Sequence, residues 1–327
     1  MNAGRSDSRI GIGAIAVALP ETRLATHAQA QRLGIDADRL ERRLGFRGLA
    51  RMGAGQDTSD LALAAVNQLM ARGLEPSSLE YLCVVTQNPD GAGLPPVSAL
   101  LHGKLGLSAR VAAFDLSHGC AGFVYGLAIS KAFMEAQGFR TGLLITADPY
   151  SKIVDSDDPK TALIFGDAAT ASVLSADYVW EVGRSDFGTD GSHCDALHIN
   201  PSGHLRMNGQ RIARICATAV PQSILRALAL NEIQLADVDE VLLHQASRYI
   251  IETIGEALQT PEKTKFYAAD YGNVISSSLP LALSAHVLPS VRRLALCGFG
   301  VGLSWASTLL TRRQAGIPEP QVSICPA

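Results

Sequence analysis

The sequence predicts an α/β fold with mainly parallel, buried strands, built from two similar halves. Short apolar runs alternate with stretches of helical periodicity, which is the pattern of a sheet covered by helices. A block of this alternation recurs once further along the chain. Apolar residues make up 47% of the 327 residues, so the chain can bury a sizeable core.

Residues 10–19 are expected to form the first buried strand. Arg5 and Arg9 precede this apolar run and imitate a secretory signal, but Pro20 and Glu21 end it without an Ala-x-Ala cleavage pattern. The alternation then predicts strands at 79–86, 111–116 and 141–147, with helices at 60–71 and 121–137.

The internal repeat predicts where the halves divide. Residues 71–87 and 229–245 each contain the end of a helix, a loop and a strand. Residues 114–120 and 266–273 each read as a strand that ends in a glycine and a polar residue, and third strands follow at 142–147 and 293–297. We therefore expect halves at 1–175 and 176–327, joined by an exposed connection at 182–208 and followed by a loosely held tail at 315–327.

The repeat also places chemically useful residues at equivalent turns. Thr86 matches His244, and Cys120 matches Asn273. Ligands of such sheets bind at the carboxyl ends of the strands, so Cys120, His244 and Asn273 are expected to face one cleft.

Composition excludes several classes of protein. A net charge of −3 argues against a general nucleic-acid surface. The six cysteines form no Cys-x-x-Cys pair, so we expect no metal site. Cys83, Cys216 and Cys297 lie inside apolar runs, which suits a reducing cytoplasm. No apolar run approaches the ~20 residues that span a membrane, so no membrane span is expected.

Cys120 is the candidate nucleophile. It lies at a strand-to-helix turn, where the positive end of a helix favours a thiolate. Gly119 and Gly122 permit a tight turn and close approach by a ligand. The alternative is a buried structural cysteine, the commonest fate of a free thiol.

A cysteine, a histidine and an amide form a coherent catalytic set. The thiolate can hold an acyl group as a thioester, while His244 and Asn273 donate hydrogen bonds to an oxygen that gains negative charge. This set suits an enolate better than hydrolysis. The glycine-rich segment 298–302 can bring backbone N–H groups near such an oxygen, or it can be a plain hairpin turn.

Five ordered motifs resemble those of the β-ketoacyl-ACP synthase III family. They are Cys120-Ala121-Gly122-Phe123, Ile164-Phe165-Gly166-Asp167-Ala168-Ala169, His244-Gln245-Ala246, Gly272-Asn273 and Gly298-Phe299-Gly300-Val301-Gly302. The similarity covers nearly the whole chain. It implies a thiolase-like, five-layer αβαβα fold built from two duplicated halves, and normally a homodimer.

The resemblance also implies roles for individual residues. Cys120 would be acylated, His244 and Asn273 would support malonyl decarboxylation, and the backbone N–H groups of Cys120 and Val301 would form the oxyanion hole. Acyl-pocket and substrate positions follow by the same match: Leu94, His118 and Phe299 for the acyl pocket, and Arg39, Arg43, Lys160, Asn208, Gln210 and Ser247 for CoA. Leu94 would reach across the dimer interface.

Several of these positions depart from the family pattern. Arg39 replaces a tryptophan that stacks on adenine, Lys160 stands near a second adenine-clamping arginine, and Ser247 replaces an asparagine. Val301 replaces a glycine, and His118 replaces a small residue and could recognise a polar acyl group. These departures suggest a specialised pathway rather than housekeeping fatty acid synthesis.

The resulting hypothesis is a condensing acyltransferase: acyl-CoA acylates Cys120, and condensation with malonyl-ACP gives β-ketoacyl-ACP. It needs acyl carrier protein as a partner and no cofactor beyond the CoA thioester. Three alternatives remain open: acyl transfer to a hydroxyl or amine without condensation, a degradative thiolase using Cys297 as base, and a catalytically silent partner subunit.

Overall fold

The protein is described by a computed structural model that covers residues 9–313 and 324–326. Its helices are α1 (Thr26–Arg32), α2 (Ala37–Leu44), α3 (Thr58–Ala71), α4 (Val97–Lys104), α5 (Gly122–Gln137), α6 (Gly209–Leu230), α7 (Arg248–Ala257) and α8 (Ser278–Ala285). Its strands are β1 (Gly11–Leu19), β2 (Arg23–Ala25), β3 (Gly48–Ala50), β4 (Tyr81–Val85), β5 (Ala112–Leu116), β6 (Thr141–Ala147), β7 (Ala169–Ser175), β8 (Trp180–Thr189), β9 (Leu197–Ile199), β10 (Leu205–Met207), β11 (Glu240–Leu243), β12 (Arg293–Gly300), β13 (Ser304–Arg312) and β14 (Ile324–Pro326).

The strands form two groups with the same pairing pattern, which confirms the predicted duplication within the fold. In the first group β4 is parallel to β6, β6 is antiparallel to β7, and β7 is antiparallel to β1. In the second group β11, β12, β13 and β8 repeat these relations in the same order. A short pairing of β1 with β8 joins the groups into one continuous sheet. The division into domains at residue 175 stays a prediction, because the sheet runs across it.

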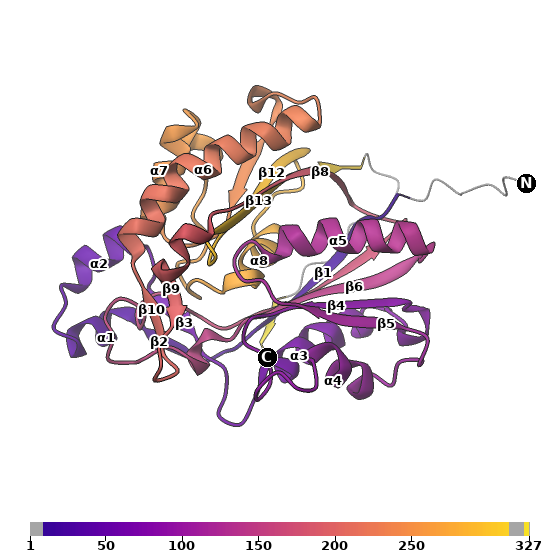
Figure 1. The fold of residues 1–327 in the computed structure, drawn as a ribbon, viewed down its shortest axis with the longest axis horizontal. Helices are drawn as coiled ribbons and strands as arrows, with labels where there is room; N and C mark the ends of the chain where they lie inside the picture. Colours follow the sequence, from indigo (N-terminus) through magenta and orange to yellow (C-terminus); the bar gives the residue numbers. More distant parts are fainter. Residues whose placement is uncertain (1–8, 314–323, 327) are drawn as a thin grey trace, which may run out of the picture.

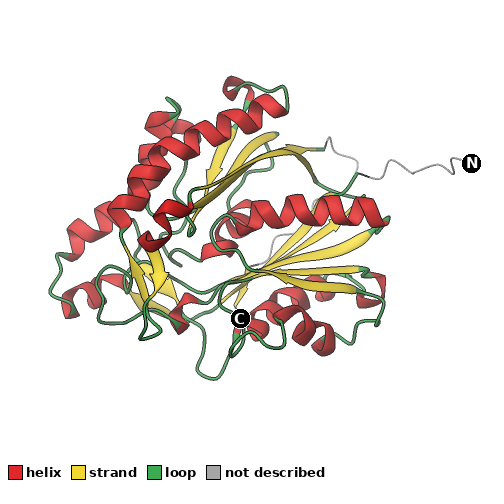
Figure 2. Ribbon diagram, viewed as in Figure 1, coloured by secondary structure: helices red, strands yellow, loops and turns green. Residues whose placement is uncertain are grey.

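Five layers follow from where the helices pack (Figure 1). The α3 and α4 helices cover the outer face of the first group of strands, and α6 covers the second group from the opposite side. The α5 and α8 helices contact strands of both groups and form the central layer. Figure 2 shows this succession of helical and strand layers, as the predicted five-layer αβαβα fold requires.

Local sequence explains the helix on which the site depends. The α5 helix buries an apolar face that includes Phe123, Leu127 and Met134, and it ends at Gly138, whose φ of 72° is left-handed. The helical spacing of these apolar residues predicted the buried face, and the glycine predicted the end of the helix. The same central layer holds the core around Phe123, packed between β4 and β12.

One sequence-based expectation is wrong in part and another is wrong. The segment 182–208 was expected to be an exposed connection, but β8 occupies residues 182–189 and pairs there with β13; most of residues 191–204 is exposed, as expected. Polar residues such as Glu181 and Asp186 hid this strand. Residues 266–273 form no strand; only Asn273 makes an isolated bridge, to Phe165. The second half therefore has no counterpart of β5.

The predicted loose tail at 315–327 lies largely outside the described residues. Its described part, β14, pairs in parallel with β1 and extends the sheet there. Within the part of the chain that the structure covers, no helix is both long and apolar enough to cross a membrane.

Candidate active site

Cys120 lies in the turn between β5 and α5, as predicted, and is buried against β12. A Cβ atom added at Gly300 would lie 2.5 Å from the Cys120 Sγ, and one added at Gly298 would lie 2.6 Å from the Cys120 carbonyl oxygen. Real Cβ atoms do not come this close, so β12 needs glycine at both positions to pack against the nucleophile. The glycine-rich segment is thus the end of a strand and a hairpin turn, as well as one wall of the site.

The thiol of Cys120 is neutral in this structure, which corrects the expected thiolate. Burial raises the pKa of Cys120 to about 12. The backbone N–H groups of Val301 and Cys120 approach the sulfur and lower its pKa, but the loss of hydration outweighs them. Those two N–H groups are the pair expected to form an oxyanion hole.

His244 follows β11 and is held by its backbone. Its N–H donates to the Cys297 carbonyl oxygen at 2.8 Å. Its ring meets the Phe299 ring edge-on, with 5.6 Å between centroids. Burial lowers the pKa of His244 to about 3, so the imidazole is neutral at pH 7. Its Nδ1 atom is buried without a partner, which leaves Nε2 as the nitrogen available to a ligand.

Asn273 is locked in one orientation by its neighbours. Its backbone N–H donates to the Ile164 carbonyl oxygen, and its carbonyl oxygen accepts from the Gly166 N–H, both at 2.9 Å. Its side-chain Oδ1 accepts from the Ile275 N–H at 3.0 Å. Because the oxygen is occupied, the amide nitrogen is the group that can donate to a ligand.

One cavity of about 630 Å³ brings these three residues together. Its lining also includes six of the positions expected to bind substrate: Arg43, Lys160, Asn208, Gln210, Ser247 and Phe299. Asn208 and Ser247 also cap α6 and α7, accepting from the backbone N–H groups of Arg211 and Ile250. The structure therefore assembles most of the predicted site from both halves of the chain.

Four predicted positions do not line this cavity with their side chains. Arg39 is exposed on α2, and its backbone N–H donates to the side chain of Asp36, the N-cap residue of this helix. Leu94 is 89% exposed in a surface loop. His118 stacks on Tyr125 with 4.3 Å between ring centroids, outside the cavity lining. Val301 contributes its backbone N–H rather than its side chain.

Charge is unevenly distributed at the mouth of the cavity. A second hollow of about 520 Å³ adjoins it and is lined by Asp155, Asp157, Asp158 and Asp195, among others. Arg206 is paired with two of these aspartates at 3.2 and 3.3 Å. Among the described residues, Arg43 and Lys160 line the mouth without an ion-pair partner, so these two cations remain available for a ligand phosphate.

The sequence did not reveal several lining residues. Leu40, Leu44 and Tyr249 come from α2 and α7, and Met207 and Ile212 from β10 and α6. Arg43 lies over the Tyr249 ring at 5.3 Å, which joins the two helices at the mouth. Only helical spacing in α2 could have shown that Leu40, Arg43 and Leu44 share a face.

Cys297 is fully buried in the same apolar cluster as Phe299 and Cys120, and it does not line the cavity. The β12 residues that pack directly against Cys120 are its neighbours Gly298 and Gly300. Within residues 9–313 and 324–326, no group of three or more His, Cys, Asp or Glu side chains is arranged to hold a metal ion.

Known proteins resemble this chain over most of its length. The family models for 3-oxoacyl-[acyl-carrier-protein (ACP)] synthase III and its C-terminal part match residues 114–191 and 228–312. The chain is 37% identical to β-ketoacyl-[acyl-carrier-protein] synthase III 1 of Halalkalibacterium halodurans over 264 residues, 78% of this chain and 83% of that one. It is 34% identical to β-ketoacyl-[acyl-carrier-protein] synthase III 2 of Streptomyces coelicolor, covering 90% of this chain and 91% of that one.

Solved structures show the same fold. The 3-oxoacyl-(acyl carrier protein) synthase III of Pseudomonas aeruginosa superimposes with a TM-score of 0.86 at 28% identity, over 94% of this chain and 99% of that one. The priming β-ketosynthase of the R1128 polyketide pathway gives a TM-score of 0.83 at 26% identity, over 93% and 96%. The chain therefore belongs to the β-ketoacyl-[acyl-carrier-protein] synthase III family.

Proposed function

We propose that the protein is a condensing acyltransferase that joins an acyl group to malonyl-ACP. The observation that carries this proposal is the convergence of Cys120, His244 and Asn273 on one cavity. A thiol nucleophile beside two neutral hydrogen-bond donors suits acyl transfer followed by enolate formation.

The reaction has two balanced halves. The Cys120 sulfur attacks the acyl-CoA carbonyl, the C–S bond to CoA breaks, and the thiol proton leaves with the CoA thiolate. Malonyl-ACP then loses CO₂, and the resulting carbanion attacks the acyl-cysteine carbonyl. The C–S bond to Cys120 breaks, giving β-ketoacyl-ACP, and the sulfur takes up a proton from solvent, which is the one proton that the overall reaction consumes.

The chain supplies different donors for the two halves. The N–H groups of Cys120 and Val301 stabilise the oxyanion of acyl transfer, since both already approach the sulfur. The His244 Nε2–H and the Asn273 amide donate to the thioester oxygen of the malonyl group, which becomes the enolate oxygen. Both groups are neutral, so neither forms an ion pair with the malonyl carboxylate. No such ion pair therefore opposes the loss of CO₂.

The cavity suits a pantetheine arm entering from the mouth. Asn208, Gln210 and Ser247 offer polar contacts along it, and Arg43 and Lys160 stand where phosphates would lie. Arg39, on the exposed side of α2, would stack on the adenine ring. No cofactor beyond the thioester is needed for this chemistry.

The family assignment supports further proposals about the assembly. We propose acyl carrier protein as the partner, and a cytoplasmic homodimer in which Leu94 enters the other subunit's acyl pocket beside His118. The nearly complete exposure of Leu94 supports such a contact. A specialised pathway is supported by the departures from the family pattern at the CoA positions Arg39, Lys160 and Ser247.

Acyl transfer to a hydroxyl or amine is the second candidate, but the fixed Asn273 amide has no clear use in it. A thiolase reaction is disfavoured because Cys297 is fully buried and does not line the cavity that holds Cys120. The intact Cys–His–Asn set also argues against a catalytically silent subunit.

The test is intact-protein mass spectrometry with a panel of acyl-CoAs, followed by malonyl-ACP. The wild type should gain one acyl group and Cys120→Ala none. Cys297→Ala, which keeps the nucleophile, should be acylated like the wild type. Malonyl-ACP should then discharge the label as β-ketoacyl-ACP. No label on the wild type, or equal label on Cys120→Ala, would defeat the proposal.

A further inference from the structure

Asp148 is a fully buried carboxylate that lies directly after β6, beneath the site but outside its cavity. Its two oxygens serve two different loops. Oδ1 accepts from the Gln87 N–H at 2.7 Å and from the Thr86 hydroxyl at 3.4 Å. Oδ2 accepts from the Ser276 hydroxyl at 2.5 Å. A buried charge with this many donors holds its surroundings firmly.

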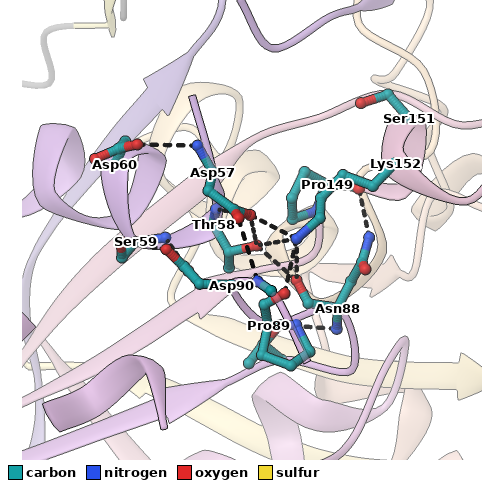
Figure 3. A network of polar contacts seen from close by, with 12 residues as sticks. Asp57, Thr58, Ser59, Asp60, Asn88, Pro89, Asp90, Pro149, Ser151 and Lys152 are labelled. Atoms are coloured by element: carbon teal, nitrogen blue, oxygen red, sulfur yellow. Dashed lines mark hydrogen bonds and ion pairs between the residues drawn. The ribbon is translucent and has the colours of Figure 1, made fainter. Parts of the chain in front are cut away.

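The first loop follows β4 and reaches the turn that carries the nucleophile. The Gln87 side chain lies so close to Gly119 that a Cβ there would be 2.5 Å from its Oε1. The loop continues into a polar network in which Asn88 donates to the Pro149 carbonyl oxygen at 2.6 Å and Lys152 pairs with Asp57 at 2.5 Å (Figure 3). This side of Asp148 is therefore anchored to the body of the first half.

The second loop carries the amide donor. Asn273 is oriented by the Ile275 N–H, and Ile275 has a φ of 51°, a left-handed conformation that is strained for a β-branched residue. Such a turn persists only if its surroundings hold it. The Ser276 hydroxyl stabilises the turn by its hydrogen bond to Asp148. The Ser277 hydroxyl stabilises it by a hydrogen bond with the Thr146 hydroxyl at 2.8 Å.

We propose that Asp148 is a positioning residue for condensation: its carboxylate ties the Asn273 turn to the loop beside the nucleophile and keeps the amide aimed at the enolate. Only a carboxylate can accept from both loops. An Asn at this position would turn an NH₂ group toward one of the donors. This inference rests on the proposed function, because it assigns Asn273 to the decarboxylation half-reaction.

The experiment measures the two half-reactions separately in the full chain. Asp148→Asn should acylate Cys120 within about 3-fold of the wild-type rate, because that step does not use Asn273. Its CO₂ release from malonyl-ACP should fall about 10- to 100-fold in kcat with little change in KM, since a donor used in the transition state is misplaced. Ser276→Ala removes the hydroxyl donor but keeps the backbone N–H of residue 276, which also bonds to Asp148, so it should lower CO₂ release less than Asp148→Asn does, about 5-fold.

Asp115→Asn is the matched control. Asp115 also accepts from two backbone N–H groups, those of Val97 and Ser98 at 2.7 and 2.8 Å, but it holds the start of α4. Its substitution should lower stability without changing the ratio of acylation to decarboxylation. If Asp148→Asn does not fold by circular dichroism, Ser276→Ala decides the matter by the same ratio.

A pH profile gives a readout that a purely structural role would not move. Burial raises the pKa of Asp148 to about 6, so wild-type decarboxylation should decline below that pH and Asp148→Asn should lack this limb. The titratable groups that face Asp148, Cys120 and Tyr150, both have pKa values raised by burial and stay neutral there.

The outcomes separate the two claims. A wild type that neither acylates nor releases CO₂ refutes the proposed function. If the wild type is active and either Asp148→Asn or Ser276→Ala has the wild-type ratio of acylation to decarboxylation, the role of Asp148 is refuted and the proposed function is not. An equal loss of both half-reactions in these variants has the same consequence.

Discussion

At the scale of single residues, burial decides the charge of the reacting groups. Water is excluded from Cys120 and His244, so the pKa of the thiol rises to about 12 and that of the imidazole falls to about 3. The sequence predicted a thiolate from the position at a helix N-terminus, and desolvation outweighs that effect. Both groups are neutral. A neutral imidazole suits hydrogen-bond donation to an enolate, and the neutral thiol stays protonated until a substrate binds.

The state of the thiol gives a pH prediction. Alkylation of Cys120 by iodoacetamide should accelerate continuously up to at least pH 10, because the reactive thiolate forms only as pH approaches 12. The measurement is peptide mass spectrometry of the Cys120 peptide, with the exposed Cys194 as internal reference. A plateau in the Cys120 rate near pH 7 would contradict the neutral thiol.

The neutral imidazole gives a stability prediction. In the unfolded chain His244 titrates near 6.5, whereas its pKa is about 3 when folded, so the unfolded state binds the proton first. The contribution of His244 to the free energy of unfolding is therefore complete above pH 6.5 and is lost as pH falls toward 3. Urea denaturation should show a shallower acid decline in His244→Gln; identical slopes would mean that the histidine is not buried as described.

At the scale of elements, the sequence predicted the strands that repeat and missed those whose polar residues hide them. Apolar runs revealed β4, β6 and β12 because each is buried on both faces. The β8 strand was missed because it lies where the two groups of strands meet and carries polar residues along its length. Nothing in the local sequence of residues 266–273 indicated that they form no strand, because a strand also depends on a partner strand in the folded chain.

The β12 strand carries a prediction about close packing. Gly300→Ala should abolish or strongly slow acylation of Cys120, because the new methyl group would lie 2.5 Å from Sγ and displace it. Gly209→Ala is the matched control: it lines the same cavity, but its nearest neighbour, Met207 Cε, would be 3.6 Å away. Acyl loading followed by mass spectrometry compares them. Wild-type loading of Gly300→Ala would show that β12 does not pack against the nucleophile.

At the scale of the whole molecule, the duplicated topology brings the site together. The predicted equivalence of the turns put Cys120, His244 and Asn273 in one cleft, and the cavity contains all three. The repeat did not predict the mouth, whose lining includes residues of α2, α7 and the β9–β10 region. Nor did it predict Asp148, because a buried carboxylate is recognised by its partners rather than by its neighbours in sequence.

The proposed homodimer belongs to this scale. The β5 strand is an edge of the sheet, and Leu94 is exposed on the same half, so a second copy would cover apolar surface. Light scattering should give about twice the mass of one chain. Leu94→Asp should weaken the assembly, with Leu288→Asp, another exposed leucine, as the control. A wild-type mass equal to that of one chain would contradict the dimer.

The most direct test of the central claim is the release of labelled CO₂ from malonyl-ACP by preformed acyl-enzyme. His244→Ala and Asn273→Ala should each carry the acyl group on Cys120 but release CO₂ at least about 10-fold more slowly than the wild type. CO₂ release at the wild-type rate by either variant would show that the imidazole and the amide do not act together with the cysteine.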